Sequence, residues 1–478
     1  MCTVPERPGV GEGVEVFFNP KGVAVIGASR EPGKVGHMVL YNLKHSFTGP
    51  IYPVNPRAKE VLGLPAYPTV LEVPDPLDLA VVAVPARIVP RVVEEAGERG
   101  VRGVIVLSAG FRETGREGAR LEEELVKTVY EYGMRMIGPN CIGVYSPASS
   151  LNATFFDPER QGFPPPGPIA FLSQSGALGA SILDWAATRG IGVSRFVSLG
   201  NKADVDEADI LAFLRRDPHT RSIAMYIEGV AEGRRFRRAL EETTPLKPVV
   251  VLKAGRTEAG ARAAASHTGS LAGSYSIYEA VFKQTGVIPT GSSEELFDIA
   301  LALALQPPPK GPRVGIVTLG GGSGVLAADE AVSLGLKVPR LSAQLQAKLR
   351  RRLPPIASTQ NPVDVTASAT DEHLLSAIAL LAESDEVDSI IIIPYFNIAT
   401  ISDEFPRKMA AIISHVAGKK TKPILAAVTG GEKAWDKARA MEEESSIPAY
   451  PSEARAVKAL WALYRYGEWL RRHRGGEG

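Results

Sequence analysis

Cysteine is nearly missing from this sequence, which contains only Cys2 and Cys141. Two cysteines cannot build the disulfide framework of a small secreted domain or a cysteine zinc site. Long apolar runs are missing as well: no stretch approaches 18 uninterrupted apolar residues, so the sequence predicts no membrane span. Residues Met1–Val16 carry Glu, Pro and Gly where a signal peptide needs an apolar core. These absences together predict a cytoplasmic protein.

An excess of charge of one sign is absent too. The formal net charge is +1, which argues against a nucleic-acid surface spread over the whole protein. We therefore expect neither a nucleic acid nor a membrane among the partners, and we expect this chain to hold no metal of its own. The apolar fraction of 45% is ordinary for a globular protein, and 478 residues are too many for a single core.

Short runs rich in Val and Ile alternate with longer amphipathic segments along the chain. Near-continuous apolar strands between helices indicate parallel sheets covered on both faces, so the expected fold class is α/β. The runs are Val23–Ile26, Leu79–Val84, Val101–Leu107, Ile169–Leu172, Val249–Leu252, Val314–Thr318, Ile390–Pro394 and Ile424–Val428. Proline-rich breaks at 161–168 and 306–312 are each followed by a strand and a small-residue turn. We expect three consecutive doubly wound domains, at residues 1–145, 146–306 and 311–478.

The first module contains a candidate nucleotide site. Its first strand runs into Gly27-Ala28-Ser29 and then Gly33-Lys34, and such a turn before a helix suits a phosphate group. The spacing matches neither Gly-x-Gly-x-x-Gly nor the Walker A pattern. The second strand ends in Asn55 and Arg57 instead of an acid, which favours a ribose that carries a phosphate, as in coenzyme A (CoA) or NADP. A structural turn with solvated basic residues remains the alternative.

A histidine among small residues is the most informative feature of the second module. His267 follows Ser266 and precedes Thr268, Gly269 and Ser270, which leave room and supply hydroxyls for a phosphoryl group. Neutral imidazole is a good nucleophile toward phosphorus. Glu228, at the end of a strand, could bond the other ring nitrogen. The turn formed by Ser173, Gln174, Ser175 and Gly176 is a second phosphate cradle at a helix start. The competing interpretation is an ordinary surface turn.

Five motifs in order give the chain a family resemblance. They are Gly27-Ala28-Ser29 with 32–36, Tyr52–Pro56, Gly138–Gly143, Ser173–Gly176 and Ser266–Gly269. This order resembles the α subunit of NDP-forming acyl-CoA synthetases, and the first two modules are similar to the α subunit of succinyl-CoA synthetase. The resemblance extends over nearly the whole chain. It implies a Rossmann-like CoA-binding domain followed by two flavodoxin-like domains.

The resemblance also implies the roles of individual residues. CoA, rather than NADP, would occupy the first module, with its phosphates and ribose held by Gly27, Ala28, Ser29, Lys34, Asn55 and Arg57. The cleft toward the thiol would be lined by Val84, Pro85, Ser108, Ala109 and Asn140. Inorganic phosphate would bind at Ser173–Gly176, and His267, oriented by Glu228, would carry the phosphoryl group. Cys141 is expected to be a small buried thiol and not a nucleophile.

The resemblance implies a reversible reaction in which acyl-CoA, ADP and phosphate give the acid, ATP and CoA through an acyl phosphate and a phosphohistidine. An ATP-grasp domain for ADP/ATP and Mg²⁺ is not accounted for in this sequence, so we expect a separate β subunit and an α2β2 heterotetramer. Acetate is the first expectation for the acid. Two alternatives stay open: a CoA-binding regulatory protein without catalysis, and an NADP-dependent oxidoreductase.

Overall fold

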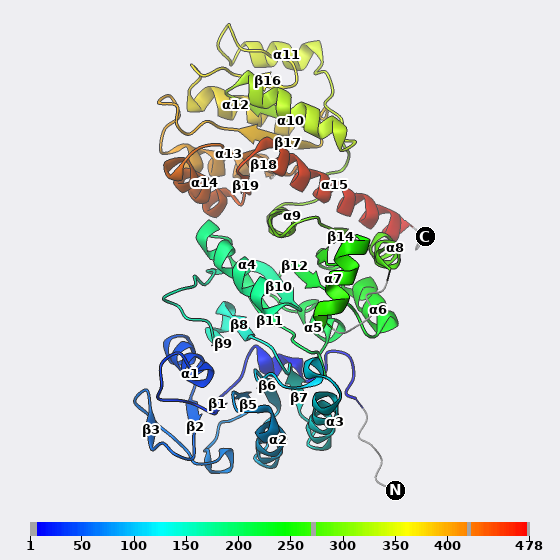
Figure 1. The fold of residues 1–478 in the computed structure, drawn as a ribbon. Coiled ribbons are helices and arrows are strands. Elements are labelled where there is room, and N and C mark those ends of the chain that lie inside the picture. Colours follow the sequence, from blue (N-terminus) through cyan, green and yellow to red (C-terminus); the bar gives the residue numbers. More distant parts are fainter. Residues whose placement is uncertain (1–6, 269–273, 418–421, 476–478) are drawn as a thin grey trace. The chain divides into compact units, whose positions relative to one another are not determined.

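The computed structural model describes residues 7–268, 274–417 and 422–475, and for 264–268, 415–417 and 474–475 it describes the backbone alone. The chain divides into two compact units, Met1–Thr290 and Gly291–Gly478. The first unit contains two sheets with parallel cores and the second contains one, each flanked by helices (Figure 1). The expected α/β class is confirmed. Among the described residues, no helix has both the length and the apolarity needed to cross a membrane.

The first sheet has the strand order β2-β1-β5-β6-β7, and all its strands are parallel. Its strands are β1 (Val23–Ile26), β2 (Ile51–Val54), β5 (Leu79–Val82), β6 (Gly103–Val106) and β7 (Arg135–Ile137). The accompanying helices are α1 (Val35–Ser46), α2 (Val89–Glu98) and α3 (Arg116–Glu131). Short elements are η1 (Val14–Phe17), β3 (Glu60–Val61), β4 (Leu64–Pro65), η2 (Val70–Glu72), η3 (Ala86–Ile88) and η4 (Arg112–Thr114).

Both faces of this sheet are buried, as the apolar runs predict. In β1, Val23 and Val25 belong to one hydrophobic cluster, and Ala24 and Ile26 belong to another. All four residues are at most 3% exposed. Alternate side chains of a strand point to opposite faces, so a strand without polar residues requires helices on both sides.

The second sheet has the order β14-β13-β12-β10-β11-β8-β9. Its strands are β8 (Gly143–Ser146), β9 (Leu151–Thr154), β10 (Pro166–Ser173), β11 (Val193–Ser198), β12 (Ser222–Ile227), β13 (Val249–Lys253) and β14 (Ile288–Pro289). The other elements are η5 (Pro147–Ser149), α4 (Gly176–Arg189), α5 (Glu207–Leu214), α6 (Gly233–Thr243), α7 (Glu258–Thr268) and α8 (Tyr275–Thr285). The pair β8 and β9 extends the parallel core with antiparallel strands.

The second unit is built on the parallel sheet β16-β15-β17-β18-β19. Its strands are β15 (Val314–Thr318), β16 (Val363–Asp364), β17 (Ser389–Ile393), β18 (Ile424–Ala427) and β19 (Ala449–Tyr450). Its helices are α9 (Ser293–Leu305), α10 (Gly321–Ser333), α11 (Ala343–Arg350), α12 (Asp371–Glu383), α13 (Phe405–Ala417), α14 (Glu432–Ser445) and α15 (Glu453–Gly475). Arg455 of α15 pairs with Asp298 of α9, which anchors α9 in this unit.

All three parallel cores share one strand order. Numbered within each module, the order is the 2-1-3-4-5 arrangement of doubly wound flavodoxin-like sheets, which bind ligands where the strand order reverses. In the first two modules this switch point lies between β1 and β5 and between β10 and β12. The loops that follow these strands are therefore the places to look for a site.

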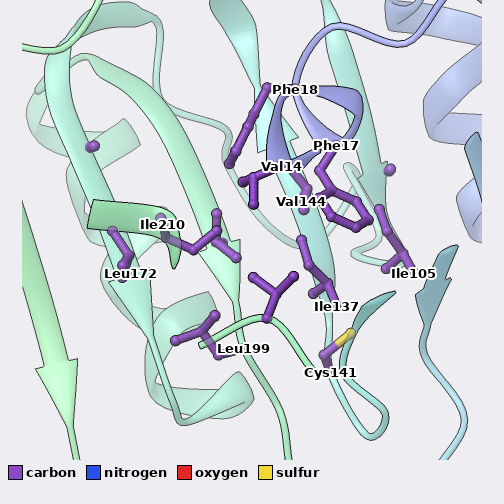
Figure 2. Packing of buried hydrophobic residues seen from close by; sticks show 14 of the residues in the cluster. Val14, Phe17, Phe18, Ile105, Ile137, Cys141, Val144, Leu172, Leu199 and Ile210 are labelled. Atoms are coloured by element: carbon purple, nitrogen blue, oxygen red, sulfur yellow. The ribbon is translucent and has the colours of Figure 1, made fainter. Parts of the chain in front are cut away.

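A single apolar core joins the first two sheets (Figure 2). The short η1 segment contributes Phe17, and the next residue, Phe18, stacks on Phe213 with ring centroids 4.4 Å apart. Both phenylalanines at 17 and 18 are fully buried. The segment before the first strand thus belongs to the core that unites the two modules.

A buried arginine interrupts the apolar pattern of β11. Arg195 is 2% exposed, and its Nε and Nη2 donate to the Asp217 carboxylate at 3.2 and 3.3 Å. Its Nη1 donates to the hydroxyls of Ser146 and Ser149. The pKa of Asp217 is lowered, because the hydrogen bonds and charge of this arginine and the hydroxyl of Thr220 outweigh the effect of burial. A buried charge is tolerated where it is paired and hydrogen-bonded in this way.

Candidate active site

The candidate CoA-binding residues follow the strands of the first sheet at one edge. Parallel strands place their carboxyl ends together, so residues distant in sequence become neighbours there. Gly27, Ala28 and Ser29 follow β1, Asn55 and Arg57 follow β2, Val84 and Pro85 follow β5, Ser108 and Ala109 follow β6, Asn140 follows β7, and Lys34 precedes α1.

The turn after β1 leaves no room for a side chain at two glycines. Gly27 has a φ of 91°, and a Cβ there would lie 2.4 Å from the carbonyl oxygen of Ala83. A Cβ at Gly36, in the first turn of α1, would lie 2.0 Å from the carbonyl oxygen of Gly27. The N-terminus of α1 therefore lies directly against this turn, which is the arrangement that holds a phosphate between a strand end and a helix start.

Asn55 joins the ends of β1 and β2. Its Nδ2 donates to the carbonyl oxygen of Ala28 at 2.7 Å, and its Oδ1 accepts from the backbone N–H of Arg57 at 2.8 Å. The side chains of Arg57 and Lys34 are exposed, and Lys34 pairs with Glu31 at 2.8 Å. Both cations can therefore approach a phosphorylated ligand, whereas the side chain of Asn55 is hydrogen-bonded to the backbone of the two loops.

A cleft of about 1690 Å³ is lined by residues that follow strands of both sheets in the first unit. From the candidate set, its lining includes Val84, Ser108, Ala109, Asn140, Gln174, Ser175, Gly176 and Glu228. The candidates outside its lining are Gly27, Ala28, Ser29, Lys34, Asn55, Arg57, Pro85 and Ser173. The structure thus brings the candidate thiol end and the candidate phosphate turn into one cleft.

The candidate phosphate turn joins β10 to α4. Ser175 is the N-cap of α4, and its hydroxyl accepts from the backbone N–H of Leu178 at 3.4 Å. Ser173 is fully buried and donates to the carbonyl oxygen of Ser175 at 2.6 Å, so its hydroxyl shapes the turn. A Cβ at Gly176 would lie 2.7 Å from the side chain of Ile142, so a residue larger than glycine would crowd Ile142 at the first position of the helix. The turn therefore places a glycine at the first residue of a helix, and a helix N-terminus can bind an anion.

Gln174 connects this turn to the candidate carboxylate. Its Oε1 accepts from the backbone N–H groups of Glu228 and Gly229 at 2.7 and 3.1 Å. The hydroxyl of Tyr226 donates to the Glu228 carboxylate at 3.3 Å. Burial and the neighbouring charge of Glu228 raise the pKa of Tyr226 to about 12, so this hydroxyl keeps its proton. The carboxylate of Glu228 is half-buried and lies in the cleft.

Lys202 and Glu207 are among the charged residues of the cleft that sequence reasoning missed. Lys202 donates from Nζ to the Glu207 carboxylate at 2.8 Å and to the carbonyl oxygen of Gly229 at 2.7 Å. Both residues follow β11, a strand that the sequence analysis did not identify because Arg195 breaks its apolar run. The polar residues that directly follow this strand were the signal in the sequence from which Lys202 and Glu207 could have been identified.

His267 is the residue before the last in α7, in the part of that helix for which the backbone alone is described. Gly269 and Ser270 lie outside the described residues. The pairing of the imidazole with Glu228 therefore stays a prediction. Lys253, at the end of β13, donates to the carbonyl oxygen of Glu228 at 2.8 Å, and burial lowers the pKa of its amine.

The loops of the two modules meet at Asn140 and Asn201. Asn140 has a φ of 59°, and its Nδ2 donates to the Asn201 side chain at 3.2 Å. Asn201 in turn donates to the carboxylates of Glu113 and Glu122 at 2.6 and 2.8 Å. Burial raises the pKa of Glu122. The neighbouring Cys141 is 4% exposed, and burial raises the pKa of its thiol to about 12, which keeps it protonated.

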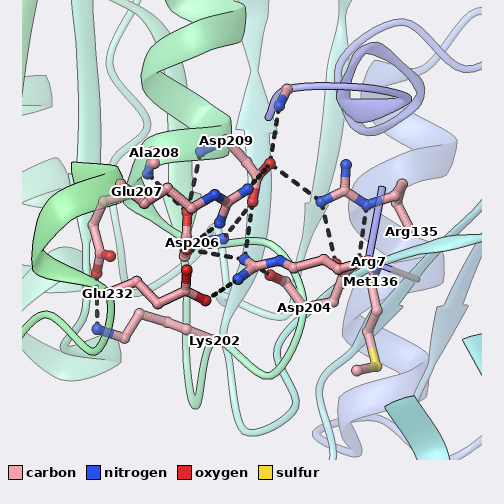
Figure 3. A network of polar contacts seen from close by, with 12 residues as sticks. Arg7, Arg135, Met136, Lys202, Asp204, Asp206, Glu207, Ala208, Asp209 and Glu232 are labelled. Carbon is pink, nitrogen blue, oxygen red and sulfur yellow. Dashed lines mark hydrogen bonds and ion pairs between the residues drawn. The ribbon is translucent and has the colours of Figure 1, made fainter. Parts of the chain in front are cut away.

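An ionic network continues from the cleft into the protein (Figure 3). Arg135 pairs with Asp204 at 3.0 Å and with Asp209 at 3.3 Å, and its side chain is 3% exposed. Arg7 pairs with Asp206 at 2.9 Å and with Asp209 at 3.3 Å. The network ties the first module and the segment before it to the loop that carries Lys202. Among the described residues, no group of three His, Cys, Asp or Glu side chains is placed to hold a metal ion.

Three family models match the chain in succession. A CoA-binding domain matches residues 21–147, a succinyl-CoA-ligase-like flavodoxin domain matches 166–303, and a ligase-CoA domain matches 314–472. These three domains correspond in order to the three sheets.

Known proteins match nearly the whole chain. The α subunit of ADP-forming acetate–CoA ligase I from Pyrococcus furiosus is 45% identical over 469 residues, which cover 96% of this chain and 99% of that protein. The ADP-forming 4-hydroxybutyrate–CoA ligase of Nitrosopumilus maritimus is 35% identical, over 95% of this chain and 64% of its own length. Among solved structures, an acetyl-coenzyme A synthetase 1 from Candidatus Korarchaeum cryptofilum in complex with phosphate and ADP matches with a TM-score of 0.88 and 38% identity, covering 97% of this chain and 99% of that one.

Proposed function

Because the chain belongs to the family of α subunits of ADP-forming acetate–CoA ligases, which is related to the succinyl-CoA ligases, we propose that it carries the phosphohistidine step of such an enzyme. The proposed overall reaction converts acyl-CoA, ADP and phosphate into the free acid, ATP and CoA, and it is reversible. The observation that carries the proposal is the cleft in which Ser108 and Asn140 of the first module meet Ser175 and Glu228 of the second.

The residues of the first module fit CoA. The turn after β1 is closed to side chains at Gly27 and Gly36, and exposed cations stand at Lys34 and Arg57. We propose that these residues hold the phosphates of CoA, with Ala28, Ser29 and Asn55 shaping the loop around them. The loops after β5 and β6 carry Val84, Pro85, Ser108 and Ala109, and these residues would then line the path of the thioester into the cleft.

The phosphate step is proposed at the β10–α4 turn. A phosphate held by Ser175 and Gly176 at the start of α4 attacks the thioester carbonyl, and the CoA thiolate leaves, which gives an acyl phosphate. The imidazole of His267 then attacks the phosphorus, and the carboxylate of the acid leaves. Glu228 would hold the far ring nitrogen and stabilise the charged phosphohistidine. Ser173 and Gln174 keep the turn in shape.

Transfer of the phosphoryl group to ADP is proposed on a partner. ADP/ATP and Mg²⁺ would bind to an ATP-grasp β subunit, and the two chains would form an α2β2 heterotetramer. Light scattering of the two chains mixed in equal amounts would measure the mass of the complex. A mixture that stays as separate chains would contradict this part of the proposal.

Phosphorylation of His267 is tested by intact-mass measurement. The chain is mixed with an ATP-grasp subunit, ATP and Mg²⁺, and the expected result is a gain of one phosphoryl group that His267→Ala abolishes. His219→Ala serves as the matched control, because His219 is exposed and outside the cleft lining. Binding of CoA without any phosphorylated species would instead support a regulatory protein.

Acetate is the proposed acid, because the Pyrococcus furiosus relative reported above, which is 45% identical, is named as an acetate–CoA ligase subunit. The 4-hydroxybutyrate ligase shows that relatives can differ in the acid. A coupled assay of ATP formation over a panel of acyl-CoA thioesters, with the partner subunit present, ranks the acids by kcat/KM. A higher kcat/KM for another thioester than for acetyl-CoA would overturn the choice of acetate.

A further inference from the structure

Lys202 occupies an unusual backbone position in the cleft. Its φ is 57°, in the left-handed region that residues with a Cβ rarely adopt, and its side chain is 17% exposed. Such positions persist when the surrounding structure holds them, and they gather at functional sites. Its Nζ is fixed by two acceptors, the Glu207 carboxylate at 2.8 Å and the carbonyl oxygen of Gly229 at 2.7 Å.

Gln174 uses the same two acceptors. Its Nε2 donates to the carbonyl oxygen of Gly229 at 2.9 Å and to the same carboxylate oxygen of Glu207. Its Oε1 accepts from the backbone N–H groups of Glu228 and Gly229. The carboxylate of Glu207 is 3% exposed, so it cannot exchange Gln174 or Lys202 for water without cost.

The loop that carries Lys202 cannot shift freely, because it is fastened to the first module. A Cβ at Gly200 would lie 2.3 Å from the carbonyl oxygen of Pro139, so the two loops touch through their backbones. The backbone N–H of Asn201 donates to that same carbonyl oxygen at 2.9 Å. Lys202 therefore lies at the end of a rigid connection between the CoA module and the phosphate turn.

From these contacts we propose that Lys202 and Glu207 are positioning residues for the phosphate step. Together they fix the amide of Gln174, and through it the backbone of Glu228, so that the β10–α4 turn and the carboxylate keep one relative placement. This inference rests on the proposed function of the turn. It extends that function to a pair of residues outside the phosphate turn.

The pair also removes an electrostatic problem. A free carboxylate at Glu207 beside the turn would repel phosphate, and a free amine would attract it to the wrong place. Pairing neutralises both, and the four hydrogen bonds of the Gln174 amide give its NH₂ and its oxygen a single orientation. Loss of either charge should therefore weaken phosphate placement and leave the distant CoA loops unchanged.

The test measures steady-state ATP formation from acetyl-CoA, ADP and phosphate by the chain combined with an ATP-grasp subunit. For Lys202→Met we expect the KM for phosphate to rise about tenfold, which is the value of one lost charged hydrogen bond, while the KM for acetyl-CoA stays within about twofold. Glu207→Gln should give the same pattern, and the double variant should be no worse than either single one, because both act through Gln174.

Lys127→Met is the matched control, since Lys127 pairs with Glu131 on the exposed surface of α3. It should leave both KM values unchanged. Lys202→Arg keeps a cation that can reach both acceptors and should recover most of the phosphate affinity. If Lys202→Met does not fold, Lys202→Gln, which removes the charge and keeps a neutral hydrogen-bond donor, must raise the KM for phosphate selectively, by less than about tenfold.

Equal rises of both KM values would indicate a general structural role and overturn the inference. Wild-type KM values in folded Lys202→Met and Glu207→Gln would overturn it as well. These failures are separable from failure of the proposed function, because the wild-type complex would still form a phosphoenzyme that depends on His267. A wild-type chain that is never phosphorylated would contradict both this inference and the proposed function.

Discussion

Replacing Asp204 by alanine should remove the main support of a buried guanidinium. Asp204 is fully buried, and its carboxylate accepts from Arg135 at 3.0 and 3.2 Å. It also accepts from the backbone N–H of Met136 at 2.7 Å and from the hydroxyl of Tyr130 at 3.2 Å. The alanine variant would leave these donors without their acceptor inside the protein.

The size of the loss follows from the contacts that remain. Removing one partner of a buried ion pair costs about 3–5 kcal/mol, because the other charge is left buried. Asp209 still lies 3.3 Å from Arg135 and compensates part of its charge, so we expect the lower end, about 3 kcal/mol. In a large domain this corresponds to a fall in melting temperature of about 6 °C or more.

Thermal and urea unfolding, followed by tryptophan fluorescence and circular dichroism, measure this loss. Glu131→Ala is the control, because Glu131 and Lys127 form an exposed pair 3.5 Å apart whose removal should cost less than about 0.5 kcal/mol. Asp204→Asn should fall between the two, since its amide oxygen can still accept a hydrogen bond. A loss below about 1 kcal/mol in Asp204→Ala would show that the network contributes little, and it would refute the reasoning.

Three further predictions concern pH, CoA binding and the thiol. Burial disfavours the ionised form of Asp209, but the charge of Arg135 and other donors outweighs burial and lowers the pKa of this carboxyl. The stabilisation is therefore present above about pH 4 and is lost as the pH falls below that value. Asp209→Asn should be less stable at neutral pH and show a flatter decline in melting temperature on acidification than the wild type, and a parallel decline would contradict this. Gly36→Ala should weaken CoA binding in calorimetry about tenfold by pushing α1 from the turn after β1, whereas Gly322→Ala, with nothing within 4 Å of its Cβ, should bind as the wild type does. The protonated, buried thiol of Cys141 should resist iodoacetamide at about pH 8 in the folded protein, and peptide mapping that finds rapid modification there would exclude its proposed inertness.

The parallel cores could be predicted from sequence because their strands are apolar on both faces. Runs such as Val23–Ile26 and Val314–Thr318 are strands with the predicted limits. The strand β11 escaped because Arg195 lies in its middle, and the partners that make this arginine tolerable are far away in sequence. The pair β8 and β9 escaped because its residues are mixed in polarity and pair with each other in the antiparallel sense.

The candidate site was predicted in part from strand ends and in part from the family resemblance. Glu228 was found because it ends an apolar strand, Ser108 and Asn140 were implied by the resemblance, and the structure places all three on one cleft. Lys202 and Glu207 could not be found in that way, since their importance depends on the two acceptors that Lys202 shares with Gln174, the Glu207 carboxylate and the carbonyl oxygen of Gly229. The η1 segment, whose Val14, Val16 and Phe17 are buried, was missed for a similar reason, because its partners come from both modules.

Arg195 also sets the limits of recombination between relatives. Its guanidinium, on β11, needs the hydroxyls at 146 and 149 and the carboxylate at 217, which come from two further stretches of the chain. A hybrid protein that takes β11 from one parent and those stretches from another would inherit a buried cation without its counter-charge, or the reverse. The three segments therefore form one inheritable block, although other pieces of the chain separate them.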